Sequence, residues 1–155
     1  MSEAQQPLFS IEKIYVKDLS LEVPGGPQTF MQPEQPQLEV QLAQKSQRVN
    51  DALFEVTLVI TVSAKRGDKT LFLVEVSQAG VFQIRNVPEA ELAPVLGMVC
   101  PNVLFPYARE TVSDIVNRAG FPPILLAPVN FEALYQQRSA EASAQPGGPR
   151  VEIAH

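Results

Sequence analysis

Hydrophobic and polar residues alternate along most of the first half of the chain. Between residues 54 and 64 every second residue is apolar, from Phe54 to Val62, and the residues between them are mostly polar. A period of two places the two sets of side chains on opposite faces of a β-strand. The same alternation runs over residues 9–23 and 38–44, so three strands are predicted in these segments.

The predicted strand at residues 9–23 has two chemically different faces. One face is expected to be apolar and to carry Tyr15, Leu19, Leu21 and Val23. The other is expected to be largely acidic and polar, with Glu12, Asp18, Ser20 and Glu22. The next segment, residues 24–37, is crowded with proline and glycine, which disfavours regular strand pairing and predicts a long crossover loop.

A fourth strand is predicted over residues 70–82, where β-branched and aromatic residues follow the polar turn KRGDK. The short turn predicts a hairpin between this strand and the one at residues 54–64. Both faces are partly apolar, with one face containing Phe72, Val74 and Val76 and the other Leu71, Leu73 and Glu75. We therefore expect one side to be covered and the other to display apolar surface that needs a partner.

In the second half of the chain the hydrophobic period lengthens to that of a helix. Val112, Ile115 and Val116 share one side of a predicted amphipathic helix. Pro106 is predicted to start this helix and Gly120 to end it, because proline is tolerated in a first turn and glycine adopts the left-handed cap conformation. Residues 100–105 are then the segment that leads into the helix.

A final helix is predicted after the proline-rich segment that follows Gly120. Asn130 is its expected N-cap, and its apolar stripe contains Phe131, Leu134 and Tyr135. Residues 145–155 return to proline, glycine and polar residues without periodicity, so this tail is predicted to be mobile, as are residues 1–8. Residues 9–144 are expected to form the folded domain.

Composition narrows the functional classes. The 155 residues are 45% hydrophobic, which fits one domain with a sizeable core. The formal net charge of -5 argues against a nucleic-acid or anionic-membrane surface and favours a basic partner. No apolar run is long enough to span a membrane, the first residues lack the pattern of a signal peptide, and a single cysteine excludes an internal disulfide. A cytoplasmic location is expected.

The residues predict no catalytic set, no metal site and no cofactor. Cys100 would need a nearby base, and the only histidine is His155 at the end of the chain. The two glycine-rich turns lack the context of a phosphate-binding loop. Asp18 and Glu22 lie about 13 Å apart by strand rise, too far for a glycosidase pair. They suit either an acidic docking patch or an ordinary solvated face, and a binding protein is favoured.

Four segments, in this order, resemble the SecB protein-export chaperone family: IEKIYVKDLSLEVP, FLVEVSQAGVF, CPNVLFPYARE and FPPILLAPVNFEALY. The resemblance extends from about Ile11 to Tyr135. It implies an α+β fold, in which a four-stranded antiparallel sheet is followed by two helices, assembled as a dimer of dimers. It also implies a cytoplasmic, non-enzymatic chaperone that holds unfolded precursor proteins in a translocation-competent state and delivers them to the SecA motor ATPase.

The resemblance also implies roles for particular residues. The family's SecA-binding sheet face corresponds here to Asp18, Glu22, Leu73 and Glu75. Residues that affect the association of dimers into the homotetramer correspond to Val74, Val76 and Gln78. The groove for unfolded clients, between the crossover loop and the last helix, would contain Phe30, Met31, Leu125, Leu126, Leu134 and Tyr135.

Three other classes stay open at this stage. A SecB-like chaperone of a toxin-antitoxin system would have the same fold and a dedicated client. A hotdog-type thioesterase would also wrap a sheet on a long helix, and would turn over acyl thioesters. A structural adaptor that binds only folded partners would fail to slow the refolding of an unfolded precursor.

Overall fold

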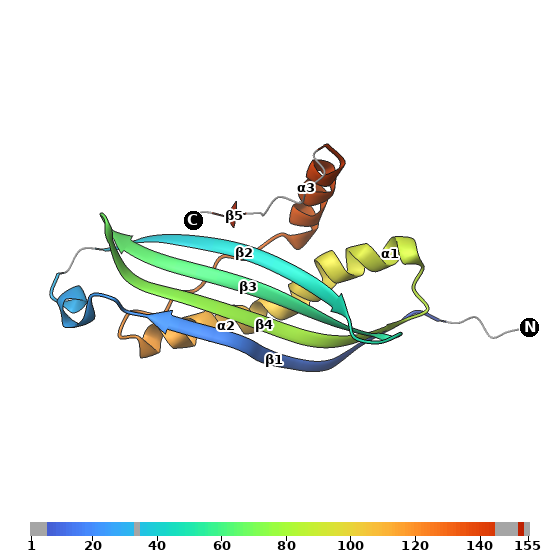
Figure 1. The fold of residues 1–155 in the computed structure, drawn as a ribbon, viewed down its shortest axis with the longest axis horizontal. Coiled ribbons are helices and arrows are strands. Elements are labelled where there is room, and N and C mark those ends of the chain that lie inside the picture. The colour runs from blue at the N-terminus through green and yellow to red at the C-terminus, as the bar shows by residue number, and fades with distance from the viewer. Residues whose placement is uncertain (1–5, 33–34, 145–151, 154–155) are drawn as a thin grey trace, which may run out of the picture.

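The computed structural model describes residues 6–32, 35–144 and 152–153. It contains one antiparallel sheet in the strand order β1-β4-β3-β2-β5 (Figure 1). The four long strands confirm the predicted ones, and the hairpin between β3 and β4 is also confirmed. Their bounds are β1 (Leu8–Glu22), β2 (Gln37–Arg48), β3 (Leu53–Arg66) and β4 (Lys69–Arg85), followed by the two-residue β5 (Glu152–Ile153).

The segment after β1 crosses from one edge of the sheet toward the other, as predicted. It includes a short 3-10 helix, η1 (Gly26–Phe30). Because of this crossover β1 pairs with β4 rather than with β2. Strands β1 and β2 are therefore on opposite sides of the central β3–β4 hairpin.

The helices follow the sheet in the chain. They are α1 (Glu89–Pro94), one π-helical turn η2 (Val95–Val99), α2 (Cys100–Arg118) and α3 (Phe131–Ala144). Helix α2 lies along one face of the sheet and packs on β4 and β3 (Figure 1). We call this face of the sheet the helix face and the opposite one the open face.

The core lies between α2 and the helix face. Strand β3 contributes Leu58, Ile60 and Val62, none of which retains exposed surface, and α2 contributes Val112 and Val116, which are equally buried. Each such side chain stabilises the fold by roughly 1.5–3 kcal/mol relative to an exposed position. The alternation of apolar and polar residues in β3 thus correctly predicts that Leu58, Ile60 and Val62 share one buried face.

Strand β1 departs from strict alternation. Its pairing with β4 shifts register after Ile11 and again after Val16. A bulge inserts one residue and moves the following side chains to the other face. Tyr15 consequently lies on the open face, where its hydroxyl hydrogen-bonds Glu55, so the expectation that Tyr15 shares a face with Leu19 was wrong.

The long helix begins earlier than predicted. Helical structure already starts at Glu89, and Pro106 lies inside α2 instead of at its start. The residues before Pro106 continue the buried stripe, since Cys100 and Leu104 are fully buried, while Pro106 itself is exposed. Their burial offsets the hydrogen bond that a proline removes from a helix interior. The predicted end is confirmed, because Gly120 follows α2 with a φ of 93°.

The last helix agrees with its prediction. The side-chain oxygen of Asn130 accepts a hydrogen bond from the Ala133 N–H at 2.9 Å, which is the expected N-cap. Phe131 is buried, and Leu134 and Tyr135 are half-buried. None of the helices in the described part of the chain is both long and apolar enough to cross a membrane.

The two predicted mobile ends lie mostly outside the described residues. Residues 1–5, 145–151 and 154–155 belong to this undescribed part. Leu8 is already the first residue of β1, and Glu152–Ile153 pairs with β2. The boundaries of the folded domain at residues 9 and 144 stay a prediction.

Candidate functional site

The four residues expected to dock SecA all lie on the open face of the sheet. Asp18 and Glu22 are exposed on β1, and Leu73 and Glu75 lie on the neighbouring β4. Glu22 and Leu73 are direct register partners, and Glu75 accepts a hydrogen bond from the Thr61 hydroxyl at 3.1 Å. We call these four residues the acidic patch. The structure brings these four residues together.

A second polar cluster on the open face was not found from the sequence. Tyr15 on β1 donates a hydrogen bond to Glu55 on β3, across the small Ala79 of β4, and the Lys17 ammonium lies 2.7 Å from the same carboxylate. The hydrogen bond to Glu55, followed by burial, raises the pKa of Tyr15 to about 12. Hydrogen bonds from Lys17 and then Tyr15 lower the pKa of Glu55. The positive charge of Lys17 therefore balances the negative charge of the Glu55 carboxylate.

The predicted client groove is only partly formed by exposed side chains. Met31 and Leu125 are 79% and 82% exposed, and Phe30 is also exposed. Leu126, in contrast, is only 7% exposed and belongs to the core, so it offers little surface to a client. The remaining two residues, Leu134 and Tyr135, are half-buried on α3.

An aromatic contact holds the crossover loop against the body of the protein. The Phe30 ring stacks on Phe121 at 5.1 Å between centroids, and Phe121 contacts the core residue Phe72 at 4.7 Å. A side chain at Gly120 would begin only 3.1 Å from the Phe30 ring, so the glycine permits this contact. The linker between α2 and α3 starts at this point and leads to α3 (Figure 1). The six groove candidates thus come from three segments, the crossover loop, the linker and α3.

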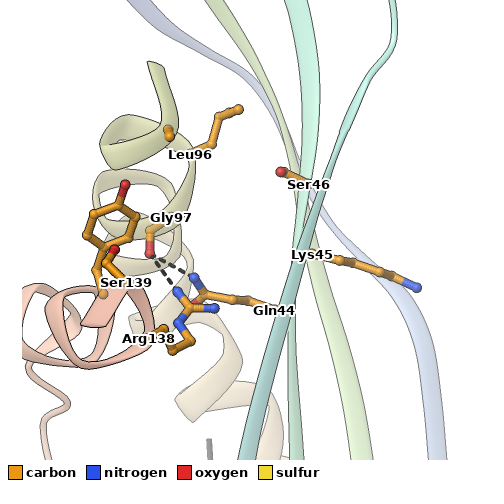
Figure 2. Close-up of a pocket in the computed structure, with 9 residues that line it drawn as sticks. Gln44, Lys45, Ser46, Leu96, Gly97, Arg138 and Ser139 are labelled. Atoms are coloured by element: carbon orange, nitrogen blue, oxygen red, sulfur yellow. Dashed lines mark hydrogen bonds between the residues drawn. The ribbon is translucent and has the colours of Figure 1, made fainter. Parts of the chain in front are cut away.

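Helix α3 docks on the π-helical turn through one backbone carbonyl. Pro101 has no N–H to offer the Gly97 carbonyl four residues before it. That oxygen instead accepts hydrogen bonds from Gln44 at 2.7 Å and from Arg138 at 3.4 Å (Figure 2). The Tyr135 ring packs on Gly97, where a Cβ would lie 2.7 Å from it. Burial at this contact lowers the pKa of Arg138.

A pocket of about 370 Å³ lies at this docking point. It opens between β2, the turn η2 and helix α3 (Figure 2). Its lining combines apolar and polar groups: Gln44, Lys45, Ser46, Ala93, Leu96, Gly97, Tyr135, Arg138 and Ser139. Only Tyr135 among these was singled out from the sequence, because the others come from segments that the fold alone brings together.

The residues expected to influence tetramer assembly are buried within the chain itself. Val74 and Val76 retain no exposed surface, and Gln78 retains 3%. The Gln78 side-chain amide donates to the Tyr15 carbonyl oxygen at 3.3 Å, and its oxygen accepts from the Thr111 hydroxyl at 3.2 Å. These residues can therefore affect assembly through the positions of α2 and β1, and their role stays a prediction.

Partly exposed apolar side chains lie on β1 as well as on β4. Four apolar residues on the helix-face side of this edge strand are each between 39% and 46% exposed. We call Phe9, Ile11, Val16 and Leu19 the β1 stripe. On β4, the open face presents the half-buried Leu73 and Val81 beside the exposed Glu75. Strand β4 is therefore covered on one face and displays apolar surface on the other, as expected, and the β1 stripe adds apolar side chains that are more exposed.

Cys100 has the environment of a structural cysteine. It is fully buried at the start of α2, and burial raises its pKa to about 12. At neutral pH the side chain is therefore a thiol and not the nucleophilic thiolate.

Comparisons with known proteins agree with one another. Residues 2–142 match the family model described as preprotein translocase subunit SecB. The chain is 65% identical to the protein-export protein SecB of Chromobacterium violaceum, over 93% of this chain and 98% of that protein. It is 59% identical to the SecB of Nitrosospira multiformis, over 99% and 98% of the two chains.

A solved structure shares the fold at low sequence identity. The Mycobacterium tuberculosis SecB-like chaperone Rv1957, solved with a peptide from the Rv1956 HigA1 antitoxin, superimposes with a TM-score of 0.61. The match covers 78% of this chain and 90% of that one, at 21% identity. This likeness supports the sheet-and-helix architecture described above.

Proposed function

Because the chain belongs to the SecB family of protein-export chaperones, we propose that it holds unfolded precursor proteins and delivers them to the SecA motor ATPase. The observation that carries the proposal is the exposed apolar surface at the crossover loop and linker, where Met31 and Leu125 are largely exposed. Such surface on a folded chain is typical of a site for another polypeptide. A client that has folded has buried the segments this surface would bind.

A single client segment is expected to bind weakly. Burial of about 400 Å² of apolar surface gains roughly 10 kcal/mol at 25 cal/mol per Å², and association and ordering cost a similar amount. Several copies held in one assembly convert later contacts into intramolecular ones and raise the avidity. Tight but sequence-tolerant retention therefore needs an oligomer, and it needs neither a nucleotide nor a catalytic residue on this chain.

The β1 stripe supports such an oligomer, which we propose is a homotetramer built as a dimer of dimers. An edge strand with apolar side chains is a surface that a second copy can cover, and most homo-oligomers are symmetric about such self-complementary patches. The buried Val74 and Val76 would influence the association of dimers indirectly, by fixing α2 on the sheet.

The acidic patch is the proposed SecA-docking surface. Its three carboxylates are exposed on adjacent strands, and none of the helices in the described residues covers the open face around them. Complementary charge on a partner would speed association and orient it. Export from the cytoplasm, with ATP hydrolysis supplied by the motor, is the process in which we place the chaperone.

The direct test is the refolding of a secretory precursor after dilution from denaturant. The wild-type protein at a stoichiometric amount of assembled chaperone should suppress refolding, and it should not bind the same precursor once folded. Leu125→Gln should weaken capture about tenfold, because it removes one apolar side chain from the interface.

Val49→Gln is the matched control for that test. Val49 is also apolar and 55% exposed, but it lies in the turn after β2. This variant should capture the precursor like the wild type. If the wild-type protein did not delay refolding, the chaperone proposal would be wrong.

A further inference from the structure

The second bulge of β1 places two opposite charges next to each other on the open face. Lys17 is the extra residue where the pairing of β1 with β4 shifts register between Val16 and Asp18. The Lys17 ammonium contacts Glu55 on the open face, and Asp18 belongs to the acidic patch on the same face. Consecutive Cα atoms are about 3.8 Å apart, so the long Lys17 side chain is within reach of the Asp18 carboxylate.

An ion pair between these two neighbours would weaken the acidic patch. It would balance the charge of one carboxylate, and its ammonium would repel the basic surface that the patch is proposed to attract. The structure does not contain this pair. Within the described part of the chain, Asp18, Glu22 and Glu75 form no ion pair, and the Lys17 Nζ lies 2.7 Å from Oε1 of Glu55.

Glu55 is the stronger of the two possible partners for Lys17. Its side chain is only 15% exposed, and a carboxylate that is partly removed from water attracts a cation more strongly than a solvated one. Asp18, in contrast, is exposed, so water and salt screen its charge. Tyr15 also donates a hydrogen bond to Glu55, and the two hydrogen bonds lower the pKa of this carboxyl, so it stays ionised.

We propose that Glu55 is a positioning residue of the docking surface, which holds the Lys17 ammonium away from Asp18 and so leaves the acidic patch free for a basic surface of SecA. The inference rests on the proposed function and deepens it, because it names a residue outside the patch that determines the charge available there. Glu55 acts through Lys17 and needs no contact with the partner.

A double-mutant cycle on the full-length assembled chaperone tests this role, with SecA affinity measured by titration calorimetry. Glu55→Gln keeps the shape of the side chain and still accepts a hydrogen bond from Tyr15, but it has no charge to hold Lys17. We expect this variant to bind SecA about fivefold more weakly, because the freed ammonium pairs with Asp18. Adding Lys17→Gln should restore the wild-type affinity, and Lys17→Gln alone should bind at least as tightly as the wild type.

Lys45 provides a control that is matched in net charge. It also lowers the pKa of Glu55 through its charge, but it lies on β2, three strand spacings or roughly 14 Å from the strand of Asp18. Glu55→Gln combined with Lys45→Gln has the same net charge as the rescued variant. Because Lys17 is still free in this combination, SecA binding should stay about fivefold weaker than that of the wild type.

Wild-type affinity in Glu55→Gln would overturn the positioning role. A loss that Lys17→Gln did not restore would overturn it as well, since Glu55 would then act by contact with SecA or through the fold. Equal rescue by Lys17→Gln and Lys45→Gln would assign the effect to net charge and overturn the proposal.

Capture of an unfolded precursor separates this inference from the chaperone function. Every variant of the cycle should capture the precursor like the wild type, and a loss of capture in Glu55→Gln would show a structural role for Glu55, against the proposal. If the wild type captured the precursor but did not bind SecA, the proposed docking surface and this inference would both be wrong, while the client-holding function would stand.

Discussion

The two outer long strands of the sheet, β1 and β2, differ in regularity and in the exposure of their apolar side chains. Strand β1 carries two bulges and an apolar stripe on its helix-face side, with exposed fractions of 39% to 46%. Strand β2 pairs without a bulge over its whole length, and its apolar residues Val40 and Leu42 are buried. An irregular, apolar edge favours a specific side-chain interface, whereas a regular edge favours backbone pairing of any sequence.

The contrast bears on where a second copy of the chain can bind. A second copy presents a fixed surface, so it can match the β1 stripe residue by residue. An unfolded client presents no fixed surface. We therefore propose that self-association occurs at β1 and that clients bind the exposed apolar side chains of the crossover loop and the linker.

The largest effect is expected from a charge in the β1 stripe. Leu19→Asp should weaken self-association by on the order of 100-fold, because a symmetric interface buries the new carboxylate twice. Sedimentation velocity across a concentration series measures the change. Ser20→Asp is the control, since Ser20 is the next residue on the same strand but faces the open side. If Leu19→Asp assembled like the wild type, β1 would not be the interface.

A second substitution tests whether the buried residues of β4, next to the β1 stripe, stabilise the fold of the chain or contact another subunit. Val76→Ala should lower the free energy of unfolding by about 2–3 kcal/mol, because Val76 has no exposed surface and its truncation leaves a cavity. Chemical denaturation measures the loss. An unchanged unfolding free energy together with loss of the tetramer would show that Val76 contacts another subunit directly, contrary to this structure.

The acidic patch provides a third test, on the open face next to the β1 bulges. Asp18→Lys combined with Glu75→Lys should weaken SecA binding about tenfold and make it less sensitive to salt, while client capture stays unchanged. Binding is measured by titration calorimetry at two ionic strengths. The control is Glu39→Lys, an exposed acidic residue on β2. If both variants lost the same affinity for SecA, the effect would come from the net charge of the chain and not from the acidic patch.

The smallest effect concerns Tyr15, which the bulges place on the open face. Its pKa is raised to about 12, so the stabilisation from its hydrogen bond is complete below pH 10 and is lost as the pH rises toward 12. Tyrosinate absorbance, followed in a background with Tyr107→Phe and Tyr135→Phe, isolates this titration. Glu55→Gln should lower the pKa of Tyr15. If the midpoint did not move, the hydrogen bond to Glu55 would not be its cause.

Much of the fold was predictable because local patterns determine it. The strict alternation over residues 54–64 reports the buried face of β3, and Asn130 and Gly120 mark helix ends through local backbone chemistry. The face of Tyr15 was not predictable, because a bulge is a property of the pairing with β4. The start of the long helix was wrongly predicted at Pro106 for a related reason, because the burial of the residues before it depends on how α2 packs on the sheet.

The candidate site was predictable where the alternation within a strand agrees with the family resemblance. The resemblance named the four residues of the acidic patch, alternation placed them on one face of their two strands, and the structure brings them together. The docking of α3 combines Gln44, Gly97 and Arg138 from three distant segments, and no local pattern connects them. Leu126 was assigned to the groove beside Leu125, although the two neighbours differ from 7% to 82% in exposure.

Hydrogen exchange with and without an unfolded precursor tests the central claim most directly, because it reports on the proposed client surface and on β1 in one experiment. The account predicts that client binding slows exchange along the crossover loop after β1 and along the linker before α3. Exchange along β1 in the assembled protein should stay unchanged. Protection confined to β1 or to the open face, with none in the linker, would contradict the proposed separation of client binding from self-association.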